Sequence, residues 1–157
     1  MSISLETWRR SASEKTREIF EPDGLLSQVI REISVKGGNF SDQTFIHQPE
    51  QARMAGNCAA TYVKGEAEGK SAISFHQAST GIGKGLAYGV PAAIHASLTG
   101  RRVIIATHTI ALQRQWTKKD GQIAEIIAER VTGKRPVVAV HRGMRSFVSI
   151  DRSERQV

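Results

Sequence analysis

The sequence predicts an α/β fold in which a parallel sheet, built from βαβ units, follows an N-terminal helical extension. Three short apolar runs lack the polar alternation of a half-solvated strand, which is typical of strands buried on both faces. These runs are residues 72–75, 101–106 and 136–140. Segments with a helical spacing of apolar residues separate them. Strands that alternate with helices indicate a parallel sheet with right-handed crossovers.

The N-terminal part reads as helical and is balanced in charge. Apolar residues at helical spacing predict one helix over residues 4–20 and a shorter helix after Pro22. Ser4 or Ser2 is suited to cap the first of these helices, because a serine hydroxyl accepts a hydrogen bond from a free backbone N–H of the first turn. Residues 1–40 therefore form the predicted helical extension.

Three more helices are predicted between and after the apolar runs. One begins at Pro49, since proline suits the first turn of a helix. The next follows a glycine-rich stretch and ends at Gly100. The last begins at Ile110, is interrupted near Gly121 and ends at Gly133. Together with the apolar runs, these helices place the first part of an α/β domain at residues 41–142.

The stretch between the first apolar run and its following helix is rich in glycine and contains one lysine. It consists of Ala78, Ser79, Thr80, Gly81, Ile82, Gly83, Lys84 and Gly85. Glycines let the backbone curl so that successive N–H groups point at phosphate oxygens, and the start of a helix adds positive charge. Lys84 is expected to reach the outer phosphates as a point charge. Strand, glycine-rich loop and helix is the context of a phosphate-binding loop.

The loop departs from the usual pattern G-x-x-x-x-G-K-[ST] at its first and last positions, where Ala78 and Gly85 stand. A serine or threonine at the last position ligates Mg²⁺ through its hydroxyl, and glycine has no hydroxyl. Mg²⁺ binding is therefore expected to be weakened. Three interpretations remain open: a phosphate-binding loop, a strand-to-helix turn that binds nothing, and a former phosphate loop that has lost its Mg²⁺ chemistry.

The formal net charge of +7 is confined to one part of the chain. Residues 101–157 contain twelve Lys and Arg against five Asp and Glu, and the preceding residues are balanced. Such an excess indicates a surface that faces a polyanion, and a solvated basic tail is the alternative. Arg142 and Arg145 are the candidate nucleic-acid contacts. Residues 143–157 are interpreted as a basic C-terminal segment.

Composition limits the remaining classes of protein. The sequence has no apolar run of about 18 residues, so no membrane span or membrane partner is expected. The first residues lack the apolar core of a secretory signal, and Cys58 is the single cysteine, so a cytoplasmic protein is expected. The five histidines are not spaced as metal ligands, and no metal site is predicted from them.

Three stretches in order resemble motifs of the DinG/XPD-like superfamily 2 DNA helicases. Residues 75–93 resemble the family's first motif, A-x-T-G-x-G-K-T-L-A-Y-L-x-P-A, and share its Leu-Ala-Tyr and its proline. Residues 102–115 resemble motif Ia, T-H-T-x-x-L-Q-x-Q. Residues 48–55 resemble the segment on the adenine side, in which a glutamine precedes Met-Ala. The chain is thus similar to the N-terminal portion of such helicases.

This resemblance implies a partial RecA-like P-loop NTPase domain that uses ATP and Mg²⁺ to move on single-stranded DNA. Gln51 would lie near the adenine, and residues 78–85 would hold the phosphates, with Lys84 as the catalytic residue. The DNA backbone would be contacted by Thr107, His108 and Thr109.

Two departures from the family narrow these expectations. Ser149 stands where the first cysteine of the family's iron–sulfur cluster would be, so no cluster is expected. DinG-like proteins of type IV CRISPR systems also lack the cluster, which makes a CRISPR effector complex a candidate partner.

The family's acidic box and second RecA-like domain are not found in the sequence, so the resemblance implies that residues 143–157 mark the point at which a longer protein is truncated. The full-length protein is therefore expected to be an ATP-dependent helicase, and this chain alone is expected to be inactive. The alternative is a truncated or decayed module that binds DNA or a partner without hydrolysis.

Overall fold

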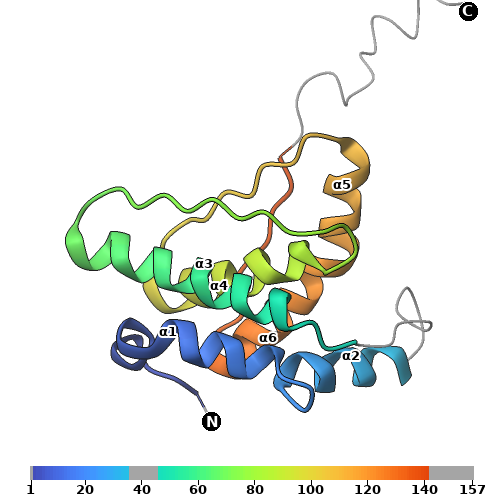
Figure 1. The fold of residues 1–157 in the computed structure, drawn as a ribbon, viewed down its shortest axis with the longest axis horizontal. Coiled ribbons are helices and arrows are strands. Elements are labelled where there is room, and N and C mark those ends of the chain that lie inside the picture. The colour runs from blue at the N-terminus through green and yellow to red at the C-terminus, as the bar shows by residue number, and fades with distance from the viewer. Residues whose placement is uncertain (1, 36–45, 142–157) are drawn as a thin grey trace, which may run out of the picture.

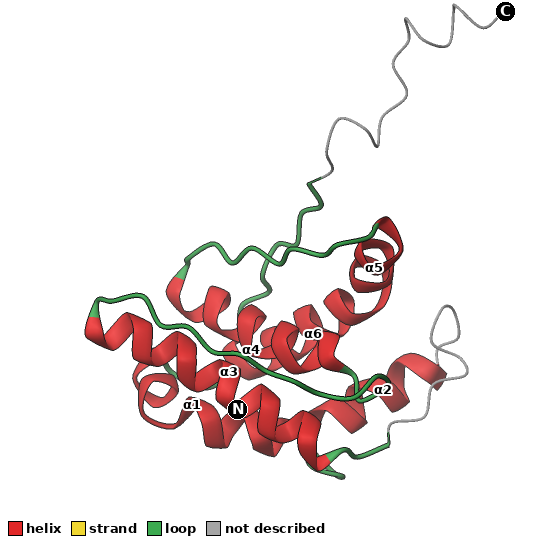
Figure 2. Cartoon of the chain, turned by 45° about the horizontal axis from the view of Figure 1, so that its top comes forward, coloured by secondary structure: helices red, strands yellow, loops and turns green. Residues whose placement is uncertain are grey.

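The chain folds into α-helices that pack against one another, with long extended segments between some of them (Figures 1 and 2). The computed structural model describes residues 2–35 and 46–141. Its elements are α1 (Leu5–Phe20), α2 (Leu25–Val35), α3 (Pro49–Glu68), α4 (Lys84–Thr99), α5 (Ile110–Gln115), the π-helical turn η1 (Trp116–Asp120) and α6 (Gly121–Thr132). Helix α3 packs between α1 and α4, and α4 packs against α6. Helix α2 packs against both α6 and α1. Five helices thus enclose one core.

The predicted α/β fold with a parallel sheet, and with it the RecA-like architecture, is wrong. The described residues contain no β-strand, and the three apolar runs at 72–75, 101–106 and 136–140 are extended backbone outside any ladder. Their side chains are not buried: Phe75 is 94% exposed, Ile104 is 90% exposed and Val137 is 95% exposed. A run of apolar residues is a buried strand only if neighbouring strands and two covering layers exist. Here the helices bury their apolar faces against each other, and the segments that contain the first two runs cross over one side of them (Figures 1 and 2).

The predicted helices are confirmed, because their local signals do not depend on a sheet. Ser4 is the N-cap of α1, and its hydroxyl accepts a hydrogen bond of 3.1 Å from the N–H of Thr7. Pro49 occupies the first turn of α3. Helices α4 and α6 end at Gly100 and Gly133, both in the left-handed conformation that glycine adopts most readily. No helix within the described ranges is long and apolar enough to cross a membrane.

The interruption predicted near Gly121 is a π-helical turn rather than a break. Helix α5 continues through η1 into α6 with helical backbone angles at the junctions. The ring of Trp116 fills the space beside two glycines: an added Cβ would lie 3.2 Å from the ring at Gly89 and 2.8 Å from it at Gly121. The π-helical turn and the two glycines, which have no side chain, therefore let this indole pack between α4 and α6.

Small side chains set the distance between α3 and its neighbours. Ala55 and Ala59 are fully buried. A Cβ at Gly56 would lie 2.7 Å from Nε of Arg17 and 3.0 Å from the carbonyl oxygen of Ser13, both on α1, so a side chain there would require α1 or the arginine to move. The close approach of α3 to the core depends on these small residues.

One histidine is buried in this core. His95 on α4 is 5% exposed, and its Nδ1 accepts a hydrogen bond of 3.4 Å from Nε1 of Trp8. Its ring stacks on Tyr62 at a centroid distance of 5.1 Å. Burial lowers the pKa of His95, although the charge of Glu66 acts in the opposite direction. The folded protein thus favours the neutral ring, whose Nδ1 is free to accept the hydrogen bond from Trp8.

Replacing Ala59 with leucine is expected to lower the free energy of unfolding by about 1–3 kcal/mol, because the added atoms have no space between α3 and the core. The matched control is Ala60→Leu, one residue along the same helix and exposed. Urea unfolding followed by circular dichroism measures both. Equal effects at the two positions would contradict the packing described for α3.

Stability is also expected to fall as the pH drops below about 6.5, the ordinary pKa of histidine. Because the pKa of His95 is lowered in the folded state, the unfolded chain binds more protons there, and stability is lost toward acid by at most about 1.4 kcal/mol per pH unit for this group. His95→Gln is expected to flatten this slope, and His108→Gln, at an exposed position, is the control. Urea unfolding between pH 7.5 and 5 gives the comparison; an unchanged slope in H95Q would contradict the assignment.

Candidate phosphate-binding site

The predicted phosphate loop is continuous with the first turn of α4. Gly81 has a φ of 89° and Gly83 a φ of 76°, and Gly83 is the N-cap of α4. Both angles lie in the left-handed region, where a side chain is costly, so these two positions require glycine. The glycines turn the chain directly into the start of a helix of 16 residues. The free N–H groups and positive end of such a helix favour an anion.

The side chain of Lys84 folds back across the loop. Its Nζ donates hydrogen bonds to the carbonyl oxygens of Ala78 at 3.0 Å and of Ser79 at 2.8 Å. The ammonium group therefore lies over the same residues whose backbone would surround a phosphate. Ser79, Thr80 and Gly81 are exposed, so the loop is open to solvent.

Helix α3 contributes one buried side chain to the loop. Gln51 is 4% exposed, and its Nε2 donates a hydrogen bond of 3.0 Å to the carbonyl oxygen of Gly83. A Cβ at Gly83 would collide with this amide. The structure thus brings Gln51 to the loop, and the role of Gln51 beside an adenine stays a prediction.

Asp120, which no sequence motif indicates, lies beside the first turn of α4. A Cβ at Gly85 would fall on Oδ2 of Asp120 and 3.0 Å from its Cγ, so the carboxylate occupies the place of the absent side chain. Asp120 is 9% exposed, and its carboxylate forms no hydrogen bond or ion pair with the described residues. Burial raises its pKa, which the charge of Lys119 partly offsets. The only signal in the sequence was Gly85 itself, because a missing side chain leaves space for a neighbour.

The start of the loop is also held against α3. Nε2 of His76 lies 3.0 Å from Oγ of Ser74 and 3.7 Å from Sγ of Cys58. Burial raises the pKa of the Cys58 thiol, which disfavours the reactive thiolate. In the part of the chain that the structure describes, no three Cys, His, Asp or Glu side chains are grouped to hold a metal ion.

The predicted nucleic-acid residues fall into two groups. Thr107, His108 and Thr109 form the turn before α5, and the hydroxyl of Thr109 caps this helix by accepting a hydrogen bond of 3.2 Å from the N–H of Leu112. His108 and Thr109 are exposed. Their contact with DNA stays a prediction. Arg142, Arg145 and the segment around Ser149 lie outside the described residues.

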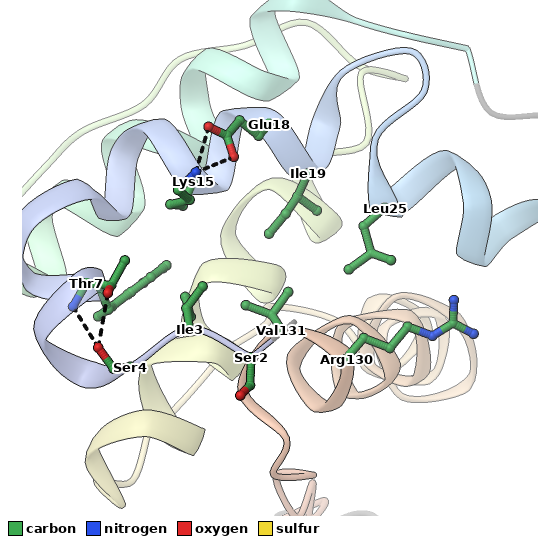
Figure 3. Close-up of a pocket in the computed structure, with 11 residues that line it drawn as sticks. Ser2, Ile3, Ser4, Thr7, Lys15, Glu18, Ile19, Leu25, Arg130 and Val131 are labelled. Carbon is green, nitrogen blue, oxygen red and sulfur yellow. Dashed lines mark hydrogen bonds and ion pairs between the residues drawn. The ribbon is translucent and has the colours of Figure 1, made fainter.

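A groove of about 890 Å³ lies apart from this loop (Figure 3). Its walls come from the N-terminal segment, α1, the start of α2 and the end of α6. The charged groups that line it are already paired, Lys15 with Glu18 at 2.8 Å and Arg130 with Glu32 at 2.6 Å. The groove offers apolar surface and no free charge, and none of its lining residues belongs to the predicted site.

The known proteins that this chain resembles in sequence are DinG helicases of mycobacteria. Over 82 residues, the chain is 38% identical to the ATP-dependent helicase DinG of Mycobacterium tuberculosis and to that of Mycobacterium bovis. The match covers 52% of this chain and 12% of each relative, so the chain spans only a small part of their length. No protein-family profile matches the chain, and no solved structure matches it. The sequence is thus partly related to DinG helicases.

The two glycines of the loop make a matched pair for testing its geometry. Gly81→Ala is expected to cost about 1–2 kcal/mol for the left-handed backbone alone, since nothing lies within 4 Å of its added Cβ. Gly83→Ala is expected to cost more, because its Cβ also displaces the Gln51 amide. The difference in cost between Gly83→Ala and Gly81→Ala should vanish when Gln51→Ala is also present. Urea unfolding of G81A and G83A, each with and without Gln51→Ala, tests this. A difference that persists without the Gln51 amide would argue against the described contact.

Proposed function

We propose that this chain is the ATP-binding portion of an ATP-dependent DNA helicase of the DinG type. The observation that carries the proposal is the loop geometry: two left-handed glycines lead into the start of α4, with the ammonium of Lys84 folded over them. The partial identity with DinG of two mycobacteria supports the same function. The proposal concerns the site and does not depend on a sheet.

The loop would bind the phosphates of ATP through groups already in place. Lys84 would exchange the carbonyl oxygens of Ala78 and Ser79 for phosphate oxygens, which carry full negative charge and form stronger hydrogen bonds with an ammonium group. The free N–H groups at the start of α4 would add donors. Bound ATP supplies the free energy of phosphoryl transfer. Gln51 would hold the carbonyl of Gly83 away from the phosphates and keep the loop in shape.

Single-stranded DNA is the proposed second partner. The exposed turn of His108 and Thr109 would contact the backbone, together with the basic side chains that follow it along α5 and η1, among which Arg114 and Lys118 are exposed. Contacts of this kind with phosphates weaken as the salt concentration rises. We assign no role to Arg142 or Arg145 from the structure.

Binding without turnover is the expected behaviour of this chain alone. Phosphoryl transfer needs groups that position the attacking water and neutralise charge on several sides, and the chain spans 12% of the DinG relatives. The assignment to CRISPR-associated DinG proteins without an iron–sulfur cluster rests on Ser149 and stays a prediction.

Lys84→Ala is expected to weaken binding of a fluorescent ATP analogue by at least about tenfold, because hydrogen bonds from a charged donor to phosphate are worth about 1.5–3 kcal/mol. Lys70→Ala removes the same charge from an exposed position and is the control. Unlabelled ATP should displace the analogue, and adenosine should not.

Equal affinities of K84A, K70A and the unchanged chain would contradict the proposal. A chain that binds single-stranded DNA but no ATP would instead support the alternative, a DNA-binding module whose nucleotide site has been lost.

A further inference from the structure

The carboxylate of Asp120 lies where the sequence lacks a ligand for a cation. Position 85 follows the loop lysine, and the side chain of a serine or threonine there would project from the first turn of α4. At Gly85, this space is filled by Oδ2 of Asp120, which comes from the junction between η1 and α6. An oxygen ligand is thus present at this place, but a different residue provides it.

Within the described part of the chain, no hydrogen bond holds the carboxylate of Asp120, although most of this residue is buried. Buried polar groups are almost always hydrogen-bonded, since burial without a partner is costly. Asp120 is 9% exposed, yet no donor from the described residues bonds to its carboxylate. The charge of Lys119 acts on this carboxylate, and the pKa of Tyr88 on α4 is raised by burial and, to a lesser extent, by the charge of Asp120. An unpartnered carboxylate at the start of α4 is therefore available for a ligand.

We infer that Asp120 is the protein ligand for a divalent cation that accompanies the nucleotide phosphates at this loop. The expected cation is Mg²⁺. The inference rests on the function proposed above. Mg²⁺ prefers oxygen ligands and is commonly held by one or two carboxylates together with phosphate oxygens and water. Asp120 would supply the carboxylate oxygen, and the nucleotide would supply the phosphate oxygens.

Gly85 has a definite role in this arrangement. A side chain at position 85 would collide with Asp120, so the glycine and the aspartate are complementary. The exchange of a neutral hydroxyl for a carboxylate also changes the charge of the site. Without a cation, the carboxylate repels the phosphates, and with a cation it attracts the complex. Nucleotide binding should therefore depend on Mg²⁺ more strongly than in a loop that ends in serine or threonine.

The test measures the affinity of the chain for a fluorescent ATP analogue with Mg²⁺ and with EDTA. The unchanged chain is expected to gain at least tenfold in affinity from Mg²⁺. Asp120→Asn is expected to reduce this gain below threefold and to bind the metal-free nucleotide more tightly than the unchanged chain does. Glu129→Gln, at an exposed position of α6, is the matched control and should keep the full gain.

A pair of variants tests the complementarity directly. Gly85→Ser alone is expected to lose helical signal or affinity because of the collision with Asp120. The double variant G85S/D120A is expected to fold and to recover part of the gain from Mg²⁺ through its hydroxyl. Circular dichroism shows which variants fold, and D120A replaces D120N if the latter does not.

The outcomes separate this inference from the proposed function. Binding of the nucleotide with the same Mg²⁺ gain in D120N as in the unchanged chain would overturn the role of Asp120 and leave the ATP site standing. Binding by the unchanged chain with no gain from Mg²⁺ would do the same. Absence of nucleotide binding with and without Mg²⁺ would overturn both.

Discussion

The hydrogen bond from the Gln51 amide to the carbonyl of Gly83 joins the packing of the helices to the shape of the loop. Gln51 can reach this carbonyl only because α3 lies close to the start of α4, and α3 lies there because small residues face its neighbours. The same carbonyl belongs to the N-cap of α4, which the chain reaches through left-handed glycines. The helical core thus contacts the loop directly, and no strand precedes the loop among the described residues.

The charged groups at the loop fit the phosphate and the neighbouring cation that we propose. Lys84 and the start of α4 provide positive charge, which the carbonyl oxygens of Ala78 and Ser79 now partly compensate. Asp120 provides negative charge on the side of α4 that packs against η1 and α6, in a place with little contact with water. A phosphate alone would satisfy the first group and repel the second. A phosphate with a divalent cation satisfies both, which is the physical reason to treat the two as one site.

The helices could be predicted from the sequence because they depend on local signals. The cap at Ser4, the proline at the start of α3 and the glycines at the ends of α4 and α6 act within one turn of their own position. The strands could not be predicted in the same way, since an apolar run such as 101–106 becomes a strand only through partners that it meets in space. Within the described residues it pairs with no other strand, and Ile104 stays exposed. Asp120 was missed for the same reason: its meaning depends on Gly85, which is far away in sequence.

The central claim is that residues 78–85 bind the phosphates of a nucleotide, and amide chemical shifts in ¹⁵N-labelled protein test it most directly. On addition of ATP with Mg²⁺, the account predicts that the largest shifts occur at Gly81, Gly83, Lys84 and Gly85 and at the side-chain amide of Gln51. Residues that line the groove between α1 and α6, such as Ile3 and Val131, should be unaffected. Shifts centred on that groove, or no shifts at millimolar nucleotide, would contradict the account.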